Sequence, residues 1–111
     1  MIGPDTPELR KARGAFFTPP AVAAFMANWA VRSEHDRLLE PSCGEASFLL
    51  AAHARLRALG AESTASDQLV GVELHQASGA HARDVLDAAG AAHTITVGDY
   101  WLFRYERGWV S

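Results

Sequence analysis

The stretch LLEPSCGEASFLLAAHARL, residues 38–56, decides the fold of this chain. It begins with a short apolar run that ends in an acid, followed by a proline and then a glycine. An alanine-rich segment with apolar residues at helical spacing comes next. This order predicts a strand, a tight turn and a helix, which is a common setting for a nucleotide-type cofactor.

The same alternation extends in both directions and predicts one helix followed by β-α-β-α-β. Strands are expected at 36–41, 68–74 and 93–103, and the later helices at 45–59 and 76–89. Gly60 and Gly90 stand where these two helices should stop. Their expected inner faces are Leu49, Ala52, Leu56 and Leu59 in one, and Ala82, Val85, Leu86 and Ala89 in the other. Such alternation is typical of a parallel sheet with right-handed crossovers, the Rossmann-like α/β class.

The first helix is expected within residues 18–33. Thr18 is the expected N-cap and Pro19 the first helical residue, where the missing N–H costs nothing. Apolar residues recur at i, i+3, i+4 and i+7 and predict one apolar face made of Val22, Phe25, Met26 and Trp29.

Composition limits the class of protein. Of 111 residues, 49% are hydrophobic and 21% charged, which indicates one packed domain. A net charge of −3 predicts no broad basic face for nucleic acid. The single cysteine excludes an internal disulfide, and the five histidines form no recognisable ligand set, so no metal site is expected. No apolar run approaches the ~20 residues of a membrane span. The expected location is the cytoplasm.

Acids close the three predicted strands: Glu40, Glu73 and Asp99. In an open parallel sheet the ligand lies outside these carboxyl ends. Three acids suit a ligand rich in hydroxyl, ammonium and amine donors and suit a polyphosphate badly. The turn at Gly44 also lacks the G-x-G-x-x-G pattern of a dinucleotide site and the lysine of a P-loop. S-adenosylmethionine therefore fits better than a dinucleotide, with a generic nucleotide fold as the alternative.

Four motifs in order, GAFFTPPAVAAFM, LLEPSCGEASFL, GVEL and VGDYWLF, resemble the first motifs of the N6-adenine DNA methyltransferases of restriction-modification systems. The resemblance spans about Arg13 to Phe103, and the FTPP segment is its most specific part. It implies that Phe17 and Thr18 lie at the methionine carboxylate and Glu40 near the ammonium. It places the backbone of Ser42, Cys43 and Gly44 under the cofactor. Glu73, with Leu74, would meet the ribose, and Asp99, with Tyr100, the adenine.

Two departures from the family stand out. Ala46 occupies a position where the family usually has glycine; a left-handed backbone there would cost on the order of 1 kcal/mol, and a helical one would only crowd the cofactor. The family's catalytic Asn-Pro-Pro-aromatic loop, which accepts from the amine of a flipped adenine, is absent from the sequence. No catalytic residue is therefore assigned, and the chain alone is expected to be inactive.

The expected organisation is an extended arm at 1–13 and a partial methyltransferase domain at 14–111, without the catalytic loop or the target-recognition domain. The leading hypothesis is the cofactor-binding N-terminal portion of a DNA adenine-N6 methyltransferase, which would meet DNA through parts outside these residues. The alternatives are a non-enzymatic interaction module derived from a methyltransferase, or a fragment of a protein-amide methyltransferase. Without a fourth strand, the first strand should form an exposed edge that favours self-association or a partner chain.

Overall fold

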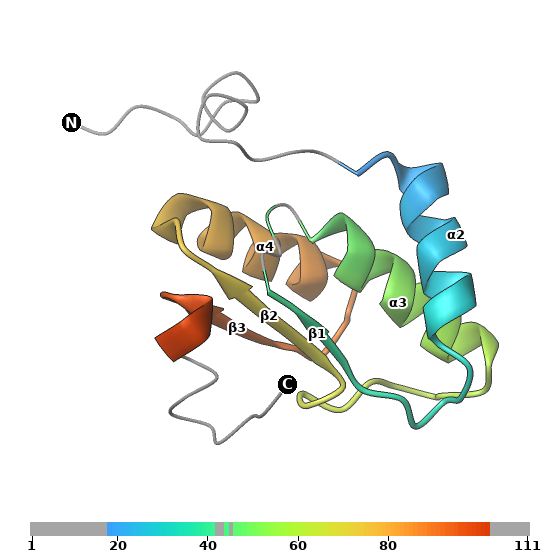
Figure 1. Ribbon diagram of the computed structural model, residues 1–111. Coiled ribbons are helices and arrows are strands. Elements are labelled where there is room, and N and C mark those ends of the chain that lie inside the picture. The colour runs from blue at the N-terminus through green and yellow to red at the C-terminus, as the bar shows by residue number, and fades with distance from the viewer. Residues whose placement is uncertain (1–17, 42–43, 45, 103–111) are drawn as a thin grey trace.

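A computed structural model describes residues 18–41, 44 and 46–102 (Figure 1). Its elements follow the predicted order of one helix and then β-α-β-α-β. Their bounds are α2 (Pro20–Ala30), β1 (Leu38–Glu40), α3 (Ser47–Ala58), β2 (Leu69–Glu73), α4 (Gln76–Ala88) and β3 (Thr94–Val97). The predicted arm at 1–13 lies outside the described residues.

The strands form one parallel sheet in the order β1-β2-β3. The central strand β2 is buried along its whole length, as its apolar sequence predicts for a strand covered on both faces. β1 pairs with β2, and no other described strand lies beside it, so β1 is one edge strand of the described sheet and β3 is the other. The parallel three-stranded sheet confirms the Rossmann-like α/β class.

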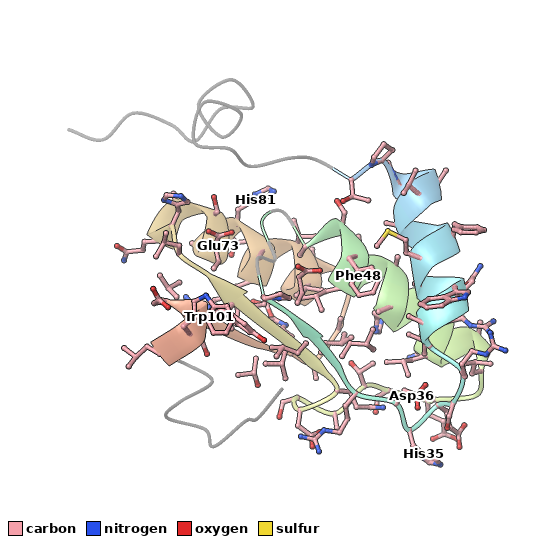
Figure 2. The ribbon with its side chains drawn as sticks, viewed as in Figure 1. His35, Asp36, Phe48, Glu73, His81 and Trp101 are labelled. Atoms are coloured by element: carbon pink, nitrogen blue, oxygen red, sulfur yellow. The ribbon has the colours of Figure 1, made fainter. Side chains whose placement is uncertain are left out.

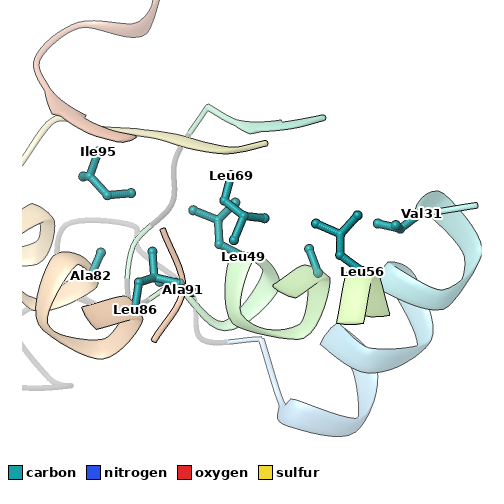
Figure 3. Close-up of a cluster of buried hydrophobic side chains, with 10 residues drawn as sticks. Val31, Leu49, Leu56, Leu69, Ala82, Leu86, Ala91 and Ile95 are labelled. Carbon is teal, nitrogen blue, oxygen red and sulfur yellow. The ribbon is translucent and has the colours of Figure 1, made fainter. Parts of the chain in front are cut away.

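Helices α3 and α4 cover one face of the sheet and enclose the main core (Figure 3). Among residues 18–41, 44 and 46–102, the core contains ten buried side chains, including the fully buried Leu49 and Leu56 of α3, Leu69 of β2 and Leu86 of α4. On the opposite face of the sheet, Val70 and Val72 pack with Leu39 and Tyr100. The helices end near the predicted glycines: Gly60 has φ of 119° and Gly90 φ of 70°, conformations that glycine adopts without penalty.

The helix α2 differs from its prediction in two respects. Pro19 is the N-cap and Pro20 the first helical residue, and no side chain caps the end, so the prediction of Thr18 as the cap was wrong. The predicted apolar face is also turned outward: Phe25 is 73% and Trp29 74% exposed. The small residues Ala23 and Ala27 are buried instead, because an alanine face lets α2 pack closely on α3.

Smaller differences concern the later elements. β3 ends at Val97, not at 103, because Asp99 starts a new helical turn there. In α4 the inner face is narrower than predicted, since Val85 is only half-buried and Ala89 is exposed. Among the described residues, no helix has the length and apolar character needed to cross a membrane.

Candidate functional site

The three predicted site segments meet at the carboxyl ends of the parallel strands. Because all strands are parallel, Glu40 at the end of β1, Glu73 at the end of β2 and the Gly98–Asp99 turn after β3 lie at the same end of the molecule. Figure 1 shows the first turn of α2 at this end too, level with the loop that follows β1. Thr18 is half-buried and lies two residues before the start of α2.

Glu73 connects the segments (Figure 2). Its side chain is 5% exposed, and its Oε1 accepts a hydrogen bond of 3.0 Å from the backbone N–H of Gly44 in the loop after β1. Its Oε2 accepts from the N–H of His75 at 2.9 Å, just before α4. Its main-chain carbonyl accepts from Gly98 at 2.8 Å, just after β3. One residue thus holds the ends of all three strands together.

The loop between β1 and α3 is left-handed at two of its three described positions, Gly44 and Ala46. Gly44 has φ of 51°, and a Cβ added there would meet no atom of the described residues within 4 Å. Ala46 has φ of 68° and ψ of 19° and is fully buried. The first of the two readings of Ala46 is therefore the correct one: the position requires a left-handed backbone. Ser42, Cys43 and Glu45 lie outside the described residues.

The helix α3 begins directly after this loop, and its N-cap residue Ala46 has no side chain that could cap the helix. The first backbone N–H groups of a helix have no partner within the helix and carry a partial positive charge. The buried carboxylate of Glu73 and the N-terminus of α3 thus flank the same loop. This environment suits a polar ligand that carries both hydrogen-bond donors and a carboxylate group.

Asp99 already has a local role. Its Oδ1 accepts from the N–H groups of Trp101 at 2.8 Å and Leu102 at 3.3 Å, so Asp99 caps the helical turn that follows β3. The side chain is exposed, and both of these bonds are accepted by the same carboxylate oxygen. Next to it, the rings of Tyr100 and Trp101 meet edge to face with centroids 5.5 Å apart.

Exposed apolar side chains follow two of the acids at the carboxyl ends of the strands. Leu74, directly after Glu73, is 65% exposed, and Trp101, two residues after Asp99, is 68% exposed. Apolar side chains beside hydrogen-bond acceptors are the usual lining of sites for small organic ligands. Glu40 is half-buried at the end of β1. Of the predicted site residues, Phe17 lies outside the described residues.

Sequence reasoning missed two contributors. The N–H of His75 bonds the carboxylate of Glu73, and a donor two residues after a strand-end acid could have been anticipated from local geometry. Gly79 lets α4 approach β3, since a Cβ there would lie 2.5 Å from Val97 Cγ2. Nothing in the local sequence predicts this close approach of α4 to β3. A hollow of about 570 Å³ lies at the opposite, amino end of β1 and β2, away from these acids, and is lined by residues such as Glu34 and Gln68.

The parallel β-α-β-α-β order, with an acid at the end of β1 and of β2, defines a Rossmann-like α/β domain. Residues 2–85 match the model of the N-6 DNA methylase family, so the chain belongs to that family and is a DNA methyltransferase by family. The match covers β1, the loop and Glu73 and stops before β3 and Asp99. No curated protein matches the chain.

Proposed function

We propose that this chain is the donor-binding portion of a site-specific adenine-N6 DNA methyltransferase of a restriction-modification or related defence system in the cytoplasm. Its ligand at the carboxyl ends of the strands is S-adenosylmethionine, which supplies a sulfonium-bound methyl group for transfer. The observation that carries the proposal is the buried carboxylate of Glu73, held against the loop of Gly44 in a chain that belongs to the N-6 DNA methylase family.

The residues present fit this ligand. An ionised carboxylate offers about four lone-pair sites, and the two backbone N–H groups on Glu73 occupy two of them. Each oxygen can therefore accept one more hydrogen bond, which suits a pair of vicinal ribose hydroxyls. No atom of the described residues lies within 4 Å of a Cβ built on Gly44, which leaves room for a ligand to pass over the loop.

Other residues would orient the remaining parts of the ligand. Asp99 keeps Oδ2 for the exocyclic amine while Oδ1 caps the following turn. Leu74 and Tyr100 would cover the faces of the base, and Glu40 would attract the methionine ammonium. Thr18, with Phe17, would meet the methionine carboxylate from the start of α2. The backbone of Ser42, Cys43 and Gly44 would lie beneath the cofactor.

Methyl transfer needs an acceptor site as well. The amine of a flipped adenine must be held and its proton accepted, and the sequence contains no Asn-Pro-Pro-aromatic motif to do so. We therefore expect no methyl transfer by these 111 residues alone. DNA would be bound by polypeptide beyond them, and the edge of β1 is where self-association or a partner chain would complete the fold.

The test is calorimetric titration of the 111-residue chain with S-adenosylmethionine, next to a Glu73→Gln variant. Binding in the micromolar range, about −8 kcal/mol, should be lost or weakened at least about tenfold when the charge on Glu73 is removed. Glu62→Gln is the matched control, because Glu62 is an exposed acid in the loop before β2. Titration with NAD separates the methyl-donor site from a general nucleotide site.

Equal binding by wild type and Glu73→Gln would contradict the assignment of Glu73. If the folded wild type binds no S-adenosylmethionine, the alternative of a non-enzymatic interaction module is favoured, and the exposed edge of β1 is the feature that supports it. A fragment of a protein-amide methyltransferase would bind the donor in the same way and differ in its acceptor.

A further inference from the structure

The strand β3, at one edge of the described sheet, has a sequence that favours pairing with another strand. All four of its residues, TITV, are β-branched. Residues 90–98, which include the strand, contain no lysine, arginine, aspartate, glutamate or proline. Segments with high β-propensity, no charge and no proline pair readily with other chains when they lie at a sheet edge. Protection of this edge must therefore come from a residue outside the strand.

The register of the sheet identifies the backbone groups of β3 that face outward. Val97 pairs with Glu73, and the N–H of Gly98 donates to the carbonyl of Glu73. Successive residues of a strand direct their backbone groups to opposite sides, so Thr96 and Gly98 face β2. The N–H and C=O groups of Ile95 and Val97 consequently face away from β2, along the outer edge of β3.

One of these outward groups already has a partner from α4. The guanidinium of Arg83 donates from Nη2 to the carbonyl oxygen of Ile95 at 2.7 Å, in a partly buried position. A hydrogen bond from an ionised donor is about twice as strong as one between neutral groups. Arg83 therefore occupies an acceptor that an added strand would use, and it places a charged side chain where that strand would lie.

Arg83 reaches this carbonyl because α4 lies close to β3. Gly79 precedes Arg83 by four residues, so both lie on the same side of α4. A Cβ on Gly79 would lie 2.5 Å from Val97 Cγ2, and the absence of this Cβ permits the close approach. The helix that packs on β3 (Figure 1) thus also supplies the charge that the strand itself lacks.

We propose that Arg83 closes the outer edge of β3 to strand pairing with a second copy of this chain. While the guanidinium binds Ile95, an added strand cannot complete its hydrogen bonds along Ile95 and Val97. Without Arg83, β3 becomes a pairing edge. The inference goes beyond the proposed function and does not rest on it, because Arg83 and the outer edge of β3 are not part of the donor site.

A second copy is the occupant that fits this edge. Two copies related by a twofold axis would bring their β3 strands together in antiparallel orientation. Ile95 and Val97 are two residues apart, so the outward groups of one copy would meet those of the other. The β-branched side chains on both strands favour such a pair. Arg83 is then the contact that prevents association of the chain through β3.

The test presents the strand of a second copy to the full chain. A flexible Gly/Ser linker of about 15 residues after Ser111 carries a copy of residues 92–98, which such a tether holds at roughly millimolar effective concentration. The fusion is prepared with Arg83 and with Arg83→Met, which removes the charge and the hydrogen-bond donors. Arg32→Met is the matched control, because it removes the same charge from an exposed residue just after α2.

Amide hydrogen exchange is followed at Ile95 and Val97, with Gly98, which bonds Glu73, as the internal reference for the fold. In the Arg83→Met fusion, Ile95 and Val97 should exchange at least about tenfold more slowly than in unfused Arg83→Met. In the fusions that keep Arg83, including Arg32→Met, the tethered strand should change their exchange by less than about twofold.

Two outcomes would overturn the proposal. The tethered strand could protect Ile95 and Val97 equally well when Arg83 is present, a result that needs no variant. Alternatively, Arg83→Met and Arg83→Gln fusions could both leave these amides unprotected although Gly98 shows an intact fold. Binding of S-adenosylmethionine is not among these readouts, so this proposal and the proposed function fail separately.

Discussion

Ala46 shows how one residue can be both required and strained. It is the N-cap of α3, has φ of 68° and is fully buried in the main core. A left-handed conformation costs an L-residue roughly 1–2 kcal/mol, so this loop stores strain beside the site. The buried methyl group offsets part of that cost, at about 0.8 kcal/mol.

Glycine at this position should therefore be nearly neutral. Ala46→Gly relieves the strain but loses the methyl burial and about 0.5–1 kcal/mol of backbone entropy. We expect a free energy of unfolding within about 0.5 kcal/mol of wild type for Ala46→Gly. Ala52 is fully buried inside α3 and is not strained, so Ala52→Gly should lower the free energy of unfolding by about 2 kcal/mol. Urea denaturation measures both, and equal losses would show that Ala46 carries no strain.

His53 gives the fold a pH dependence. Its Nδ1 is buried without a hydrogen-bond partner among the described residues. Desolvation, and secondarily the positive charge of Arg57 one turn later, lower the pKa of His53 below its ordinary value of 6.5. The unfolded chain therefore takes up a proton at a pH where the folded chain does not.

The sign follows from linkage. Stability contributed by neutral His53 is fully present above pH 6.5 and decreases as the pH falls from 6.5 toward the lowered folded pKa. We expect His53→Gln to reduce the loss of the free energy of unfolding between pH 7 and pH 5.5. Denaturation series at both pH values provide the comparison, with the exposed His35→Gln as the control. If His53→Gln and wild type lose the same free energy of unfolding between pH 7 and pH 5.5, His53 is not the source of the pH dependence.

At the scale of elements, α4 and β3 are joined by a close approach. Gly79 lies inside α4, where glycine costs about 1 kcal/mol relative to alanine, and a Cβ there would lie 2.5 Å from Val97 Cγ2. Close packing of α4 on β3 is the physical reason to keep a glycine at this position. Val97 pairs with Glu73 in the sheet, and the N–H of the next residue, Gly98, donates to the carbonyl of Glu73.

Gly79→Ala should consequently destabilise the protein by about 1–3 kcal/mol despite the better helix propensity of alanine. Removing the opposing methyl groups with Val97→Ala should restore part of the loss. A double-mutant cycle measured by thermal or urea unfolding should give a favourable coupling of at least about 1 kcal/mol between the two substitutions. Strictly additive effects would mean that the helix shifts to avoid the contact.

For the molecule as a whole, stability should be distributed from the centre of the sheet outward. β2 is buried along its length and pairs on both sides, whereas β1 has a partner on one side. Edge elements open locally at lower free energy than central ones. The sheet should thus be most protected at β2, where Glu73 anchors the site, and less protected at β1.

Hydrogen exchange of the unmodified chain tests this gradient. Amides of β2 should exchange most slowly, Leu38 of β1 faster, and Leu39 fastest because its N–H points to the outer edge. Protection of Leu39 comparable to that of β2 in a monomeric sample would be inconsistent with an open edge.

The order of elements, the glycine stops at Gly60 and Gly90 and the acids at the strand ends could all be predicted from the sequence, because they depend on local periodicity and local turn chemistry. The family resemblance is confirmed over residues 2–85. The roles of the individual site residues remain predictions.

Tertiary structure alone decided three other features. The bond between Glu73 and Gly44 joins residues 29 positions apart, the left-handed backbone of Ala46 depends on how the loop closes over that bond, and α2 buries its alanines and exposes its large apolar face. Periodicity shows that a helix has an apolar face, but not which neighbour that face meets. Since α3 offers α2 a close helix contact and α2 contacts no described strand, the small residues turn inward and the large apolar side chains of α2 face solvent.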